Sequence, residues 1–152
     1  MKVAVASDHA GFELKTAIVE HLKGAGHEVL DLGTDSPAPV DYPVFCAACA
    51  RAVVAGEAEM GVVVGGSGQG EQISANKVHG ARAALCHDEY TARLARRHND
   101  ANLLSIGARV TAEALALILV DTFLATAFDG GRHRSRIEQV SAIEIEECAK
   151  RA

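Results

Sequence analysis

The sequence has no tryptophan, only two tyrosines and four phenylalanines, and no block of basic residues. With 15 basic against 20 acidic residues, its formal charge is -5. Proteins that bind nucleic acid over an extended surface carry clustered basic side chains, often with aromatic ones between them. We therefore expect no nucleic-acid partner, although a few local arginines are sufficient to bind one small anion.

Long apolar runs are also missing, and we expect no leader segment. No stretch approaches the roughly 18 apolar residues that span a bilayer. The N-terminal segment MKVAVASDHAG becomes polar too early for a secretory signal. We expect a cytoplasmic protein with no membrane partner. A length of 152 residues, 49% of them hydrophobic, predicts one domain that spans residues 1–152.

Cysteine is scarce: Cys46 and Cys49 form a single C-x-x-C pair, and the other two are Cys86 and Cys148. A metal site would need a second pair of ligands, and a redox site would need an exposed thiolate at a helix start. The pair lies instead within an alanine-rich amphipathic stretch. We interpret both residues as buried small apolar side chains, with redox or metal chemistry as the alternative.

Five short apolar runs, rich in β-forming residues, are separated by helical patterns. The runs occupy residues 3–7, 28–32, 60–65, 81–86 and 102–107. Helices are expected over residues 11–26, from near Pro43, from near Glu71, after His87 or Asp88, from Thr111 as an N-cap, and after Gly130 and Gly131. This alternation predicts a Rossmann-like three-layer α/β/α sandwich with a five-stranded parallel sheet. The extra C-terminal helix is free to cross to a partner.

Polar residues collect in the loops that follow these strands. In an open parallel sheet, ligands bind at the carboxyl ends of the strands. The loops at that edge contain Asp8 with His9, Asp41 with Tyr42, the segment GGSGQGE, and Arg109. An Asp-His pair alone is often a helix cap or a turn. Four such loops at one edge predict a shared binding site.

The segment GGSGQGE, residues 65–71, offers backbone N–H groups at a helix start, which is an anion site. It is not a P-loop, because no G-K-[ST] follows; the alternative is a tight turn that needs glycine. Glu71 at its end either complements the helix dipole or acts as a general base. In the second case Ser67 and the nearby amides would stabilise the oxyanion that proton removal creates.

A second polar group occurs in FDGGRHRSRIE, where Arg132 and Arg136 are four residues apart. We expect them to share one helix face and to bind one phosphate, with a solvated basic face as the alternative. His98 and Asn99 follow the fourth predicted helix and precede the fifth strand. They belong to the opposite edge of the sheet, so they can reach the glycine segment only in another subunit. If the two residues are functional, the protein is at least a dimer.

The motifs SDHAGFELK, DYP, GGSGQGEQISANK, RHNDANLLSIGARV and GGRHRSRIE occur in this order over nearly the whole chain. In order and spacing they resemble the type B ribose-5-phosphate isomerases and their relatives, the galactose-6-phosphate isomerase subunits. The resemblance implies an aldose-ketose isomerase for a small phosphorylated sugar, interconverting ribose 5-phosphate and ribulose 5-phosphate through a cis-enediolate. It also implies that no metal or cofactor is needed.

The resemblance also implies roles for single residues. Asp8 and His98 would assist ring opening, with Asn99 beside them. The enediolate oxygen would be held by Ser67 and by the amides of Gly66, Gly68 and Gly70, and Tyr42 would line the sugar pocket. The phosphate would be bound by His9, Arg109, Arg132 and Arg136, with His133 as a further candidate.

One departure concerns the base. Many members of the resembled family carry a cysteine base where this chain has Gly65, whereas a second subgroup uses a glutamate that Glu71 matches. From the position of His98 and Asn99 we expect a homodimer with sites across the interface, and a tetramer is left open. Two alternatives remain: the same chemistry on a tetrulose, allose or galactose phosphate, or a non-catalytic α/β module that binds phosphate or a nucleotide.

Overall fold

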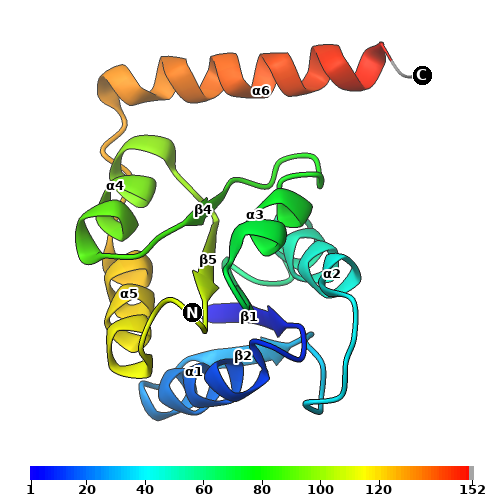
Figure 1. Ribbon diagram of the computed structural model, residues 1–152. Helices are drawn as coiled ribbons and strands as arrows, with labels where there is room; N and C mark the ends of the chain where they lie inside the picture. The colour runs from blue at the N-terminus through cyan, green and yellow to red at the C-terminus, as the bar shows by residue number, and fades with distance from the viewer. Residues whose placement is uncertain (151–152) are drawn as a thin grey trace.

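The computed structural model describes residues 1–150 and alternates strands with helices (Figure 1). In chain order the elements are β1 (Lys2–Ser7), α1 (Phe12–Gly24), β2 (Glu28–Asp31), α2 (Tyr42–Val54), β3 (Met60–Gly65), α3 (Gln69–Ala75), β4 (Ala83–Leu85), α4 (Glu89–Asn99), β5 (Leu103–Gly107), α5 (Glu113–Ala125), the 3-10 turn η1 (Gly131–His133) and α6 (Arg134–Ala149). All five predicted strands and all six predicted helices are present.

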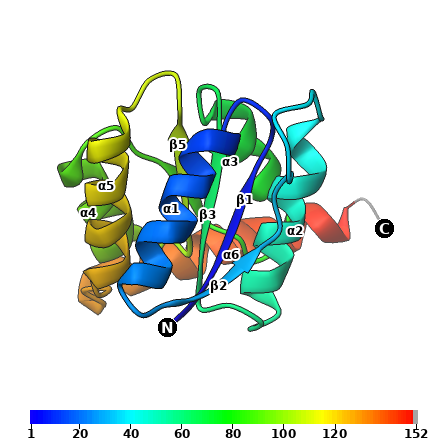
Figure 2. The same cartoon turned by 90° about the horizontal axis from the view of Figure 1, so that it is seen from below.

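The five strands form one parallel sheet in the order β2-β1-β3-β5-β4. Helices α1, α4 and α5 cover one face, and α2 and α3 cover the other. Seen along the sheet, the loops after β1, β3 and β5 gather at one edge, and the connection from α5 to α6 lies at the other (Figure 2). The predicted three-layer sandwich is confirmed.

The strand sequences explain the two layers. Val3 and Val5 of β1 pack into the core beneath α1 and α5, while Ala4 and Ala6 face α2. Because successive side chains of a strand point to opposite faces, both alanines of β1 lie on the α2 side of the sheet. The cores on both faces are closed, as expected for strands without polar alternation.

Two helix starts test the predicted caps. Asp88 caps α4, because its carboxylate accepts a hydrogen bond of 2.7 Å from the Thr91 amide. The predicted cap at Thr111 is wrong: α5 begins at Glu113 with Ala112 as the N-cap residue. The Thr111 hydroxyl is instead buried and has no hydrogen-bond partner among residues 1–150. Thr111 lies in the loop after β5, one residue before the N-cap.

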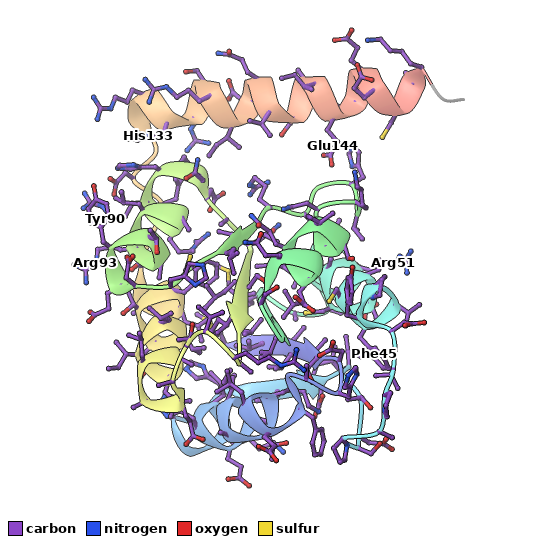
Figure 3. All side chains as sticks on the ribbon, in the orientation of Figure 1. Phe45, Arg51, Tyr90, Arg93, His133 and Glu144 are labelled. Atoms are coloured by element: carbon purple, nitrogen blue, oxygen red, sulfur yellow. The ribbon has the colours of Figure 1, made fainter. Side chains whose placement is uncertain are left out.

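Helix α6 lies across the end of the sandwich, and none of its residues is buried (Figure 1). Val140, Ile143 and Ile145 are each more than half exposed. Glu144 points from α6 toward the body (Figure 3), where its carboxylate accepts a hydrogen bond of 3.0 Å from the Gly80 amide. Within residues 1–150, no helix has the length and apolar character needed to cross a membrane.

Candidate active site

The glycine segment forms a tight turn between β3 and α3. Gly68 has a φ of 79°, in the left-handed region that favours glycine. A Cβ atom there would lie 2.5 Å from Leu85 Cδ1. The buried Ser105 hydroxyl donates a bond of 2.7 Å to the Gly68 carbonyl, which fixes the turn from the neighbouring strand. The turn therefore requires glycine at residue 68, in agreement with the alternative interpretation of this segment as a tight turn.

Glu71, in the first turn of α3, folds back over the end of β3. A Cβ atom at Gly65 would lie only 1.9 Å from Glu71 Oε1 and 2.0 Å from Cδ. The carboxylate thus occupies the space that any side chain at residue 65 would need. A cysteine at residue 65 and this placement of Glu71 therefore exclude each other.

Burial raises the pKa of the Glu71 carboxyl above its ordinary value, and the negative charge of Asp8 adds to this shift. Hydrogen bonds from the amides of Glu71 and Gly68 act in the opposite direction. Burial, followed by the charge on Glu71, also raises the pKa of the Cys46 thiol well above its ordinary value. Cys46 therefore stays protonated and adds no charge behind the carboxylate.

A cavity of about 440 Å³, here called the carboxyl-edge cavity, opens beside this carboxylate. Its walls come from the loops after β1, β3 and β5 and from the start of α2. It is lined by Asp8, His9, Ala10, Tyr42, Gly66, Ser67, Gly70, Glu71, Arg109 and Val110. Four loops predicted to share a site do line one cavity.

Local hydrogen bonds orient the first of these side chains. Asp8 is buried, and its carboxylate accepts a bond of 3.0 Å from the Gly11 amide at the start of α1. Asp8 therefore binds the backbone at the start of α1 and lines the cavity at the same time. His9 Nδ1 lies 3.2 Å from both the amide nitrogen and the carbonyl oxygen of Val40, so the backbone before α2 anchors the imidazole at the cavity wall.

Two further side chains depend on glycine for their positions. A Cβ atom at Gly70 would lie 2.5 Å from Tyr42 Cζ, so the phenol ring packs directly on the backbone of α3. A Cβ atom at Gly66 would lie 3.3 Å from Arg109 Nη1. Arg109 therefore borders the cavity of its own chain.

The remaining predicted residues lie at the opposite edge of the sheet. We call His98, Asn99, Arg132, His133 and Arg136 the amino-edge cluster. His98 and Asn99 are the last two residues of α4 rather than residues after it. The imidazole of His133, at the start of α6 (Figure 3), stacks on that of His98, with centroids 4.2 Å apart and planes 9° from parallel.

The expectation that Arg132 and Arg136 share one helix face is wrong in detail. Arg132 belongs to the 3-10 turn η1, whereas α6 begins only at Arg134. Gly130 and Gly131 have φ values of 65° and 53°, which no α-helix allows. A 3-10 turn has three residues per turn, so a spacing of four does not align side chains across this junction. Arg132 directly precedes the stacked His133, and Arg136 follows it by three residues.

The cysteine interpretation is confirmed for the C-x-x-C pair. Cys46 and Cys49 are fully buried on α2, and Cys49 Sγ lies 3.6 Å from the Ala4 carbonyl oxygen. Burial raises the pKa of the Cys49 thiol to about 12. Neither sulfur is an accessible thiolate.

Comparisons with known proteins agree with this geometry. Residues 3–140 match the family described as Ribose/Galactose Isomerase. Ribose-5-phosphate isomerase B of Escherichia coli is 46% identical over 143 residues, which cover 94% of this chain and 96% of that protein. Ribose-5-phosphate isomerase B of Clostridium thermocellum superposes with a TM-score of 0.96 and 48% identity, covering 97% of this chain and 99% of that one.

A structure of ribose-5-phosphate isomerase B from Mycoplasma genitalium with bound ribulose-5-phosphate is also similar. Its TM-score is 0.90 at 40% identity, and the match covers 95% of this chain and 97% of that one. The matches extend over strands, helices and both groups of polar residues, so the likeness is one of whole chains.

Proposed function

The chain belongs to the ribose/galactose isomerase family, and from this premise we propose that it interconverts ribose 5-phosphate and ribulose 5-phosphate, with Glu71 as the base. The observation that carries the proposal is the Glu71 carboxylate, which lies buried over Gly65 at the wall of the carboxyl-edge cavity. The activity named for the similar isomerases supports the substrate, as does the ribulose-5-phosphate bound to the Mycoplasma genitalium protein.

The chemistry needs a base and a site for negative charge. A hydrogen next to a sugar carbonyl is only weakly acidic, so the developing enediolate oxygen must be stabilised as the proton leaves. Ser67 Oγ already accepts a bond of 3.3 Å from the Gln69 amide, so its own hydroxyl proton can point to the sugar. The amides of Gly66 and Gly70 lie beside it in the same wall. Glu71 then takes the proton from C2 of the aldose and returns it to C1.

Burial of Glu71 suits this role. A general base works best when its pKa is close to the working pH, and the pKa of Glu71 is raised above that of an ordinary glutamate. The arrangement differs from a bare phosphate cradle, in which a buried carboxylate would repel the ligand.

We propose that the complete site requires two chains. The carboxyl-edge cavity contains Glu71 and Asp8, whereas His98 lies at the end of α4, and Arg132 and Arg136 lie in η1 and α6. The start of α6 is at the other edge of the sheet (Figure 2). A homodimer that sets one edge against the other would join Asp8 and Glu71 of one chain to His98 and Arg136 of its partner. The exposed Val140, Ile143 and Ile145 of α6 are apolar surface suited to such contacts. The cytoplasmic location and a single domain of residues 1–152 stay predictions.

The Glu71→Gln variant tests the proposal. The amide retains the shape of the side chain but cannot accept the proton, so turnover of ribose 5-phosphate should be nearly abolished while sugar-phosphate binding is retained. Retained turnover would disprove the role of Glu71. Kinetics of the wild type with four-, five- and six-carbon sugar phosphates test the substrate: a higher kcat/KM for a tetrose or hexose phosphate than for ribose 5-phosphate would overturn it.

A further inference from the structure

The carboxylate of Asp129 lies beside the two stacked imidazoles of the amino-edge cluster. One ring nitrogen of His98, one of His133 and a carboxylate oxygen of Asp129 all lie within 4.8 Å of one another. Three such groups suggest a metal site, but a metal ion lies in the plane of an imidazole that binds it. The two rings are stacked with planes only 9° from parallel, so one ion cannot lie in both planes.

Arg97 holds Asp129 in place. Its Nε donates to both carboxylate oxygens at 3.0 Å, and its Nη2 lies 3.0 Å from Oδ2. The backbone adds a bond of 3.0 Å from the Asp129 amide to the Arg97 carbonyl. Forked arginine-carboxylate contacts fix geometry as well as charge. The segment before η1 is thereby tied to the last turn of α4, which carries His98.

The negative charge of Asp129 has a defined electrostatic effect on the stack. Its pKa is lowered, chiefly by the hydrogen bond from Arg97, so it stays ionised. The pKa of His133 is lowered by burial and by the neighbouring His98, Arg132 and Arg136, whereas Asp129 acts in the opposite direction. Two stacked rings in a basic environment repel each other when both are charged. Asp129 is the group of this set that offsets the repulsion.

We propose that Asp129, clamped by Arg97, is a positioning residue that holds His98 for opening of the sugar ring. The inference rests on the proposed function, in which His98 of one chain serves the carboxyl-edge cavity of the other. Asp129 acts through His98 and His133, because it keeps the two rings stacked and so sets the direction of the His98 imidazole. It need not contact the sugar.

The proposal separates two steps of the reaction. Ribose 5-phosphate closes to a furanose through its 4-hydroxyl and must be opened before the proton next to the carbonyl can move. 4-Deoxyribose 5-phosphate has the same chain length and phosphate, but it lacks the hydroxyl that closes this ring. A defect confined to ring opening therefore slows the first substrate and spares the second, whereas loss of the base stops both.

The experiment compares both sugars in Asp129→Asn, Arg97→Met and the double variant. The matched control is Asp121→Asn, which removes an exposed carboxylate that lies 2.7 Å from His21 Nε2. A general acid-base group contributes about 10²–10⁴-fold, and a misdirected one loses part of this. We therefore expect kcat for ribose 5-phosphate to fall by about tenfold or more, and kcat for the open sugar to change by less than about twofold. The double variant should lose no more than either single variant, and the control should match the wild type.

If Asp129 acted only through its negative charge, the kinetics of Asp129→Asn would differ. Removing a negative charge would strengthen phosphate binding, which lowers KM and leaves kcat unchanged. That outcome, equal losses on both sugars, or additive losses in the double variant would overturn the proposal. Glu71→Gln on the open sugar provides the separate test of the base, so failure of that assignment is distinguishable from failure of this one.

An NMR titration of the imidazoles without substrate gives a readout independent of turnover. In Asp129→Asn the pKa of His133 should fall further below its ordinary value, because a negative charge that favours its protonated form is gone. The ¹⁵N shifts of His98 should change at the same time as its ring loses its fixed direction. An unaltered titration of His133 would show that the carboxylate does not act on the stack.

Discussion

A single methyl group at residue 65 should displace the base. In Gly65→Ala the new Cβ would lie 1.9 Å from Glu71 Oε1, whereas ordinary contacts begin at 3.4 Å. The carboxylate must therefore move by more than about 1 Å, and a displacement of that size costs about 10²-fold in rate when it affects a reacting group. The obstructing atoms belong to the end of a flexible side chain, so the fold should accommodate the change at little cost in stability.

The assay is steady-state turnover of ribose 5-phosphate together with thermal melting. We expect kcat to fall by about 10²-fold with a melting temperature close to that of the wild type. Gly24→Ala is the matched control, because a Cβ atom there has nothing within 4 Å at the far end of α1, and it should keep full activity. Full activity in Gly65→Ala would refute the placement of the carboxylate and with it the role derived from that placement.

Two other substitutions near the cavity give distinct results. The pKa of Glu71 in the folded protein is raised above its ordinary value of 4.5. The free energy of unfolding of the wild type therefore decreases as the pH rises from 4.5 through the raised pKa, because the folded state must give up a proton that it binds more tightly than the unfolded state. Glu71→Gln should therefore melt at a higher temperature than the wild type at neutral pH, and the difference should vanish below pH 4 in a pH series of melting curves; a constant difference would contradict the shift. Gly70→Ala would place a methyl group 2.5 Å from Tyr42 Cζ, so kcat/KM should fall by about tenfold. Its melting temperature should not fall, because alanine favours the helix; unchanged kinetics would mean that the tyrosine ring does not shape the pocket.

The fold could be predicted from the sequence because its signals are local. Apolar runs such as residues 60–65, glycine stops such as Gly24 and the cap at Asp88 depend on neighbours in the chain. The predicted cap at Thr111 was wrong by one residue: Ala112 is the N-cap of α5, and Thr111 is buried in the loop before it. A helix cap is predicted from the next few residues of the chain, and that prediction takes no account of packing against other elements.

The carboxyl-edge cavity could be predicted for a similar reason. Strand ends of a parallel sheet meet at one edge, so Asp8, Tyr42, Ser67 and Arg109 converge without knowledge of packing. Contacts between segments that are distant in the chain could not be predicted from the sequence. Arg97 and Asp129 are 32 residues apart, and the acid before Gly130 and Gly131 reads as part of a turn. The stacking of His133 on His98 was likewise beyond any spacing rule.

Mixing two inactive variants tests whether one active site is built from two chains. In Glu71→Gln the base is absent, and in His98→Asn the ring-opening group is absent, so each homodimer should have little activity. After subunit exchange, half of the dimers are mixed, and each contains one site with the intact Glu71 of one chain and the intact His98 of the other. The account predicts recovery to about a quarter of wild-type activity. No recovery after demonstrated exchange would mean that both residues act within one chain, and would contradict it.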